Sequence, residues 1–404
     1  FEVLAVTSYH RRGLRRGMYM KKQLEKLKKF WKLIFGRTGI LVFLLLVQAV
    51  ILFGGFALID KSAWIVNYTI GLLAVIILIY ILNARSNSSF KLMWIILILV
   101  VPVVGVAFYI FTRVQPGTAY ISHRVNALIE EEKDYLTPHK DTLYDVYAES
   151  KQECGFMQYL YKRGKYPVYS NASVKYFPLG EDKFQELLYQ LERAEMWNRI
   201  LRILARKARE GVEVRFMYDG TCTLSLLPRN YPKRLEQLGI QCKIFAPMRP
   251  FLSTHQNNRD HRKIAVIDGR AAFTGGVNLA DEYINRKERF GHWKDTAVMV
   301  QGEAVNSFTL MFLQLWNINV KEKEDYSKYM HYTSVIDRGM RNGGYVVPYG
   351  DSPYDDEDVG EKVYLDILNR SQDYVHIMTP YLIIDEEMIN ALIFAAQRGV
   401  EVKL

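Results

Sequence analysis

The chain has 404 residues, of which 50% are hydrophobic and 24% are charged, and it carries a formal charge of +10. The high hydrophobic content and the small numbers of Gly and Pro exclude disordered and collagen-like classes. The three cysteines, Cys154, Cys222 and Cys242, cannot all pair with one another and show no C-x-x-C spacing. Neither a fully paired disulfide framework nor a cysteine zinc site is therefore expected.

The positive charge is concentrated at the amino-terminal end. Residues 1–37 contain eleven Lys and Arg against two Glu, so the rest of the chain is close to neutral. A basic arm directly before a hydrophobic segment is typical of a cytoplasmic juxtamembrane region that contacts anionic lipids. Met18 and Met20 are alternative initiators, in which case the residues before them are not native. The nearly neutral remainder argues against nucleic acid as a partner.

Three uncharged hydrophobic segments follow the basic arm, at residues 38–59, 62–84 and 92–112. Each is long enough for a helix to cross the hydrocarbon core of a bilayer. We therefore expect a multi-pass membrane region over residues 38–112, with two or three hydrophobic helices. Pro102 and Gly105 leave two alternatives for the third segment, a full crossing or a bend that returns to the same side. The membrane face of the domain that follows is left open.

Beyond residue 113 the sequence is typical of a globular α/β domain. Amphipathic helical stretches, such as residues 200–210, alternate with short apolar runs rich in β-branched residues, such as residues 264–267. This alternation predicts helices layered on a sheet.

An internal repeat divides this domain. Residues 208–215 recur as residues 396–403 with a spacing of 188, and in both copies a helix is predicted to end at a Gly and continue into a strand. A repeat of this length predicts two duplicated half-domains, residues 113–330 and an incomplete second half, 331–404. A strand followed by a loop, predicted over 374–384, has no counterpart in the first copy, where about fifteen residues are missing.

One stretch in the first half combines residue types suited to chemistry at phosphorus. His261 and Lys263 are two residues apart, so on a strand they project from the same face. The Lys263 ammonium can neutralise a phosphate oxygen while the neutral His261 imidazole attacks the phosphorus atom.

The residues after this pair support the same interpretation. Asp268, followed by Gly269, predicts a tight turn into a second strand. Gly276 lets the backbone approach a ligand closely, and the Asn278 amide can hold a phosphate oxygen. Asp295 is a candidate for orienting the histidine and stabilising its charged form.

The whole pattern, His-x-Lys-x4-Asp followed by Gly-Gly-x-Asn, resembles the HxKxxxxD signature of the phospholipase D superfamily. Together with the hydrophobic segments, it looks like the bacterial cardiolipin synthases. The resemblance implies a duplicated α/β/α sandwich whose second half is truncated here, preceded by transmembrane helices in the bacterial cell membrane. It also implies phosphatidylglycerol and other anionic phospholipids as partners, transfer through a phospho-histidine with release of glycerol, and neither a metal nor another cofactor.

The resemblance also implies roles for single residues. His261, Lys263 and Asp268 take the catalytic positions, and Lys263, Gly276 and Asn278 bind the substrate phosphate. Asp295 is implied as a supporting acid. Which of the family's two motif histidines is the nucleophile is left open.

The sequence departs from the family pattern in one important respect. It contains no second His-x-Lys-x4-Asp, which the repeat spacing would place roughly 45 residues past Leu404. Either the chain is a fragment or a second copy supplies the acid, and we expect weak or no activity from the isolated chain. The alternatives are a membrane-bound phospholipase D-type phosphodiesterase and a non-catalytic, decayed paralogue. A membrane-tethered nuclease is disfavoured by the near-neutral charge.

Overall fold

The computed structural model describes residues 63–404 except 85–87, 114–115, 137–139, 192–195, 226, 229, 248–258, 290, 321, 323, 331–342, 355–356 and 380. The basic arm and the first predicted hydrophobic segment, residues 38–59, lie outside the described residues. The chain divides into two compact units, with the main boundary after Gly117. Each unit is described by itself.

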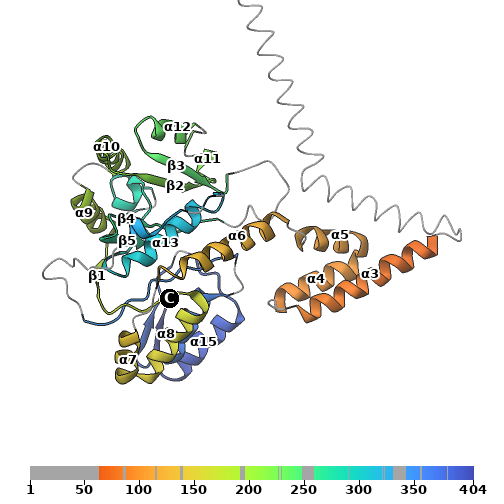
Figure 1. Ribbon diagram of the computed structural model, residues 1–404. Coiled ribbons are helices and arrows are strands. Elements are labelled where there is room, and N and C mark those ends of the chain that lie inside the picture. Colours follow the sequence, from red (N-terminus) through yellow and green to blue (C-terminus); the bar gives the residue numbers. More distant parts are fainter. Residues whose placement is uncertain are drawn as a thin grey trace, which may run out of the picture. The chain divides into compact units, whose positions relative to one another are not determined.

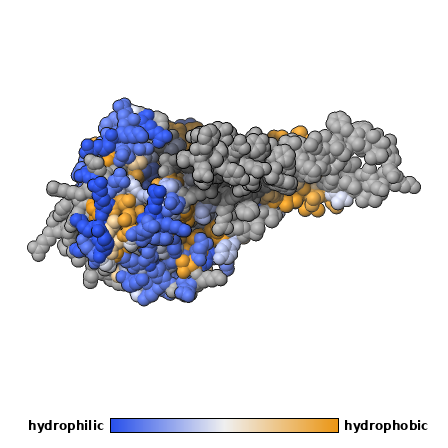
Figure 2. All heavy atoms as spheres, turned by 90° about the horizontal axis from the view of Figure 1, so that it is seen from above, coloured by the Kyte–Doolittle hydropathy of each residue, from blue (hydrophilic) through white to orange (hydrophobic). Residues whose placement is uncertain are grey.

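The described part of the first unit consists of the hydrophobic helices α3 (Ala63–Asn83), α4 (Ser88–Val100) and α5 (Pro102–Arg113). They share a small apolar core that includes Ile81 and Ile98, and the Trp94 ring packs edge-on against Tyr109 at 5.2 Å. Many other apolar side chains on these helices are exposed, and orange patches mark them in Figure 2. Among the residues whose side chains the structure describes, no helix combines the length and the hydropathy that a membrane crossing needs.

The third predicted segment forms two helices instead of one. Helix α4 ends at Val100, and α5 starts at Pro102, whose ring cannot be accommodated in the interior of a straight helix. Gly105 then approaches the preceding helix so closely that a Cβ built there would lie 2.8 Å from the Ile98 Cα. Of the two alternatives for this segment, the structure shows a sharp bend.

The second unit carries the remaining elements. Before the motif these are α6 (Pro116–Glu132), α7 (Lys140–Glu149), α8 (Lys151–Gly164), β1 (Ala172–Phe177), α9 (Gly180–Leu191), α10 (Met196–Arg209), β2 (Arg215–Asp219), α11 (Cys222–Ser225), α12 (Tyr231–Glu236) and β3 (Gln241–Phe245). After it follow β4 (Ala265–Ile267), β5 (Ala271–Gly275), η2 (Asp281–Ile284), β6 (Ala297–Gly302), α13 (Val305–Trp316), η3 (Ser327–Tyr329), α14 (Val359–Arg370), β7 (Tyr374–His376), α15 (Glu386–Gln397) and β8 (Glu401–Lys403).

The main sheet has the strand order β1-β6-β5-β4, and all its neighbouring strands are antiparallel. Its two faces are covered by different helices, as Figure 1 shows for α9 and α13. Phe273 of β5 is completely buried in a core with residues of α9 and α10, whereas its neighbour Ala272 belongs to a core with residues of α13. Successive residues of a strand point to opposite faces, so this alternation confirms a helix–sheet–helix sandwich.

Two smaller sheets complete the unit, the parallel pairs β2–β3 and β7–β8. The repeat is visible in them, because α9, α10 and β2 correspond to α14, α15 and β8. Gly211 and Gly399, which follow the equivalent helices α10 and α15, have nearly the same left-handed φ, 93° and 92°. Strand β7, which ends at His376 and is followed by a loop as predicted, lies between α14 and α15 in the sequence, whereas only residues 192–195 separate α9 from α10.

Candidate active site

His261 and Lys263 lie in an extended segment that leads into β4. The predicted strand was expected to include both residues, but β4 begins only at Ala265. The preceding residues are anchored elsewhere, since Arg259 Nη1 donates to the Ala246 carbonyl at 2.6 Å. The Asp260 amide donates to Asp219 Oδ2 at 3.2 Å. The histidine therefore lies where the chain crosses from the carboxyl ends of β2 and β3 to the edge of the main sheet.

The structure brings the His261 and Lys263 side chains to one region. Lys263 Nζ donates to the His261 carbonyl at 2.7 Å. Ala265 packs against the core formed with α9 and α10. Residues at alternate positions of an extended segment share a face, so His261 and Lys263 lie on this same side of the sheet.

The electrostatics of this segment favour a neutral imidazole. Partial burial and the positive charge of Lys263 lower the pKa of His261, while Asp260 and Asp219 act in the opposite direction. At pH 7 the His261 ring is therefore mostly neutral, which is the form that can attack phosphorus. Burial also lowers the pKa of Lys263, and Asp260 and Asp295 oppose this by stabilising the ammonium.

Gly276 and Asp295 are in direct contact next to this segment. The Gly276 amide donates to the Thr296 carbonyl at 3.0 Å, which continues the pairing of β5 with β6. A Cβ built at Gly276 would overlap the Asp295 carboxylate, so the missing side chain makes this close approach possible. Asn278 follows two residues later and is half-buried.

The Asp295 carboxylate lies against the backbone at Gly276 and raises the pKa of Lys263. Its Oδ1 accepts a hydrogen bond from the Thr296 amide at 2.8 Å. The structure describes both Asp295 and His261 and gives no hydrogen bond between them. The role of Asp295 in orienting His261 stays a prediction.

Asp268 lies in the turn between β4 and β5. Its φ is 51° and that of Gly269 is 61°, and the Arg270 amide donates to the Ile267 carbonyl at 2.9 Å. The predicted tight turn is therefore present. The Asp268 side chain is exposed, and the whole of β4 separates it from Lys263. A catalytic role of Asp268 stays a prediction.

Lys183 is a site residue that the sequence pattern did not single out. It lies in the first turn of α9, its side chain is buried, and its Nζ donates to the Val277 carbonyl at 3.4 Å. The Asp295 carboxylate raises the pKa of Lys183, and the Lys263 ammonium lowers it. One signal was present in the sequence, because Lys183 is four residues before the buried Leu187 and shares its helix face.

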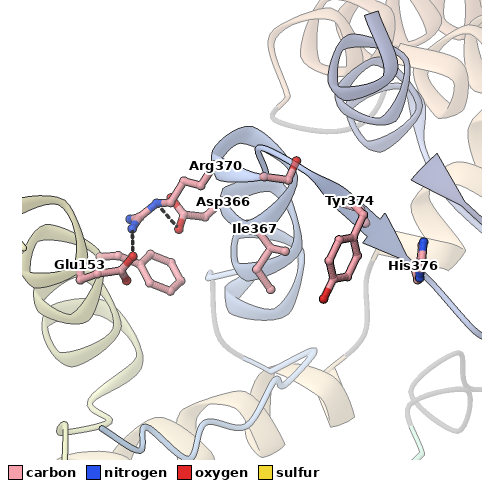
Figure 3. A pocket seen from close by; sticks show the side chains of 9 residues that line it. Glu153, Asp366, Ile367, Arg370, Tyr374 and His376 are labelled. Carbon is pink, nitrogen blue, oxygen red and sulfur yellow. Dashed lines mark hydrogen bonds and ion pairs between the residues drawn. The ribbon is translucent and has the colours of Figure 1, made fainter. Parts of the chain in front are cut away.

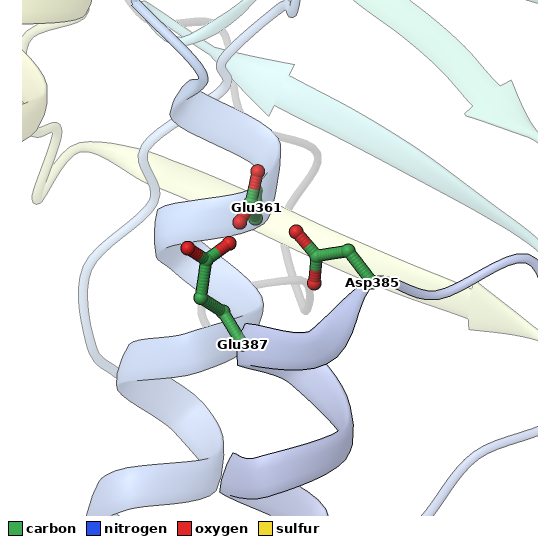
Figure 4. Close-up of side chains that lie close together, drawn as sticks. All are labelled: Glu361, Asp385 and Glu387. Atoms are coloured by element: carbon green, nitrogen blue, oxygen red, sulfur yellow. The ribbon is translucent and has the colours of Figure 1, made fainter. Parts of the chain in front are cut away.

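Among the residues that the structure describes, one group of three carboxylates is close enough together to share a metal ion. Oxygens of Glu361, Asp385 and Glu387 all lie within 4.8 Å of one another (Figure 4). Asp385 already has a structural partner, since its Oδ1 accepts from the Met388 amide at 3.0 Å and caps α15. None of the three belongs to the motif around His261.

An open cavity of about 490 Å³ lies beside β7. Figure 3 shows Arg370 in this cavity between Glu153 and Asp366, with an ion pair of 2.8 Å to each. Tyr374 and His376 line its other side. No residue of the His-x-Lys motif contributes to it, so this cavity is distinct from the candidate phosphate site.

Comparison with known proteins assigns the family. The family model "Phospholipase_D-nuclease N-terminal" matches residues 72–113, and "Cardiolipin synthase, PLD-like domain" matches residues 187–316, which include His261 and Asp295. A cardiolipin synthase of Alkalihalophilus pseudofirmus is 30% identical over 368 residues, covering 85% of this chain and 71% of the relative. The chain belongs to the cardiolipin synthase family.

Other proteins that match the chain differ in how much they share with it. An uncharacterised protein of Streptococcus mutans is 47% identical over 340 residues, covering 81% of this chain and 73% of its own length. A cardiolipin synthase of Geobacillus kaustophilus is 33% identical over 259 residues, or 60% of this chain and 51% of the relative. Among solved structures, phosphatidylserine synthase of Haemophilus influenzae matches with a TM-score of 0.42 and 13% identity, covering 63% of this chain and 65% of that one.

Proposed function

We propose that this member of the cardiolipin synthase family is a phospholipase D-type phosphatidyltransferase that forms cardiolipin and glycerol from two phosphatidylglycerol molecules. The observation that carries the proposal is the placement of His261 and Lys263 at alternate positions of the extended segment before β4, with Lys263 Nζ donating to the His261 carbonyl at 2.7 Å. The match of the cardiolipin synthase domain model to the residues around this pair supports it.

The first step on this proposal forms a covalent intermediate. A nitrogen of neutral His261 attacks the phosphorus of the first phosphatidylglycerol, and the bond from phosphorus to the glycerol oxygen breaks. Lys263 neutralises a non-bridging oxygen, where negative charge must be stabilised in the transition state. The leaving glycerol takes a proton from a second acidic group, which the family resemblance assigns to a second motif histidine.

The second step reverses these changes with another alcohol. A hydroxyl of the second phosphatidylglycerol attacks the phosphorus and gives its proton to the base formed in the first step. The phosphorus–nitrogen bond breaks, which restores neutral His261 and releases cardiolipin.

The remaining predicted residues have supporting roles in this scheme. The half-buried Asn278 is proposed to hold a second phosphate oxygen, and Gly276 keeps the backbone close enough for this. Asp295 is proposed to stabilise the Lys263 ammonium. Asp268 is proposed to act through the turn that connects β4 to β5, because its side chain is exposed there.

A membrane location is part of the proposal. The exposed apolar side chains of α3, α4 and α5, the basic arm before them and a lipid substrate all support a multi-pass attachment to the bacterial cell membrane. The bend at Pro102 supports a third segment that does not cross as one straight helix.

A phospholipase D-type hydrolase is the second candidate, because water can resolve a phospho-histidine as well as an alcohol can. Purified chain in detergent with phosphatidylglycerol separates the candidates. Cardiolipin and glycerol support the transferase, and phosphatidic acid with glycerol indicates a hydrolase. The His261→Ala variant is expected to lose all product, whereas His376→Ala, which changes an exposed histidine of β7, is expected to retain it. Measurable product that is equal in wild type and His261→Ala would refute the proposal.

A further inference from the structure

Lys183 is an unusual residue for the interior of a domain. Its side chain is 5% exposed, and lysine is rarely buried unless its charge is paired. Its Nζ donates to the Val277 carbonyl at a long 3.4 Å, which does little to offset the loss of water from an ammonium. An apolar side chain at this position would suit the helix and the core at least as well as lysine does.

The charges around Lys183 belong to the candidate active site. The elements packed near its helix carry several ionisable groups, namely Glu181, Asp182 and Glu186 on α9, Asp281 and Glu282 on η2, Asp295 before β6 and Lys263 before β4. Of these, Asp295 favours its charged form and Lys263 disfavours it. The ammonium is therefore coupled to the two charges that flank the proposed phosphate position.

Lys183 and Asp295 contact adjacent residues of one backbone segment. The Asp295 carboxylate lies against Gly276, and the Lys183 ammonium lies on the carbonyl of Val277. The next residue is Asn278, the proposed ligand of a phosphate oxygen. A cation and an anion thus hold the backbone that presents this amide.

We propose that Lys183 is a positioning residue of the phosphate site, which holds the Gly276–Asn278 backbone and balances Asp295 while Lys263 binds the phosphate. The inference rests on the proposed function. A phosphodiester bound at Lys263 adds a negative charge next to the Lys183 ammonium and favours its protonation. Because burial lowers the pKa of Lys183 to about 8, phosphodiester affinity is expected to fall as the pH rises through this range.

The test measures binding of sn-glycerophosphoglycerol to the full chain in detergent, by calorimetry from pH 6.5 to pH 9.5. This probe is a phosphodiester whose single charge is constant over that range. Wild type is expected to lose affinity about tenfold between pH 7 and pH 9.5. Lys183→Met is expected to bind about tenfold more weakly at pH 7 and to show no loss above it. Lys183→Arg keeps a cation and is expected to bind at every pH.

Lys175→Met serves as the matched control, since Lys175 is an exposed lysine on β1 that pairs with Glu186. It is expected to keep the wild-type affinity and pH profile, and melting temperatures confirm that each variant is folded. A Lys183→Met chain with the wild-type pH profile would overturn the role of Lys183. If Lys263→Met abolishes binding while Lys183→Met leaves it intact, only this inference fails. A wild-type chain that does not bind the probe overturns the proposed function as well.

Discussion

Replacing Lys183 by Met tests whether the buried amine lowers the stability of the fold. Burial lowers the pKa of Lys183 to about 8 from an ordinary value of 10.5. A folded-state pKa below the unfolded one means that the unfolded chain binds the proton more tightly. The charged lysine therefore favours unfolding at neutral pH, and methionine, which is unbranched and apolar, removes this penalty.

The magnitude follows from the two pKa values. Their difference corresponds to about 3 kcal/mol of stability lost by wild type at pH 7. The substitution also leaves the Val277 carbonyl without its 3.4 Å hydrogen bond, at a cost of about 1 kcal/mol. Lys183→Met is therefore expected to be more stable than wild type by about 2 kcal/mol at pH 7. The same variant is expected to bind the phosphodiester more weakly, so function and stability move in opposite directions.

The pH dependence gives the decisive measurement. Between about pH 8 and pH 10.5 the unfolded lysine still holds its proton while the folded one has lost it, so wild-type stability rises relative to the variant. The advantage of Lys183→Met is largest below pH 8, and above about pH 10.5 only the cost of the lost hydrogen bond remains, which makes wild type more stable by about 1 kcal/mol. Urea denaturation in detergent, followed by tryptophan fluorescence, measures this difference, with Lys175→Met as the exposed control. A Lys183→Met chain that is less stable than wild type at pH 7 would refute the reasoning.

Three further substitutions test the geometry of the site. Gly276→Ala is expected to weaken sn-glycerophosphoglycerol binding at least about tenfold, because the new methyl group displaces the Asp295 carboxylate. The control is Gly155→Ala in α8, where the space around the glycine is open, and it is expected to stabilise the chain by about 0.5–1 kcal/mol. Lys263→Met is expected to raise the pKa of His261, so diethylpyrocarbonate modification of His261, located by mass spectrometry, should begin at higher pH. Asp268→Asn is expected to change neither probe affinity nor melting temperature, because Asn adopts a φ near 51° readily. A large loss of binding in Asp268→Asn would place this side chain at the phosphate.

The repeat could be predicted from the sequence because its signal is local. A glycine that follows an amphipathic helix adopts the left-handed conformation whatever surrounds it, and Gly211 and Gly399 do so with nearly equal φ. The turn at Asp268 and Gly269 is local in the same sense. The position of the bend in the third hydrophobic segment also follows from one residue, Pro102, although the sequence left open whether a bend would form.

The site could be predicted less completely because its arrangement depends on contacts between distant segments. The start of β4 was misplaced because Arg259 is held by the carbonyl of Ala246, which draws the chain away from the sheet before His261. Lys183 was overlooked because a lysine near the start of a helix is normally solvated. Its burial becomes evident only when α9 packs against the segments that carry Val277, after β5, and Asp295, before β6.

The two copies of the repeat show what the shorter one lacks. In the second copy, β8 pairs in parallel with β7, the strand that precedes it in the sequence. The equivalent of β8 in the first copy is β2, and among the described residues β2 pairs only with β3, the strand that follows it. A strand between α9 and α10 would extend the parallel pair at β2, next to the loop that carries His261. In its place, the Asp219 carboxylate at the end of β2 accepts the Asp260 amide and forms an ion pair of 3.6 Å with Arg259. These polar contacts hold the segment before His261 at the carboxyl end of β2.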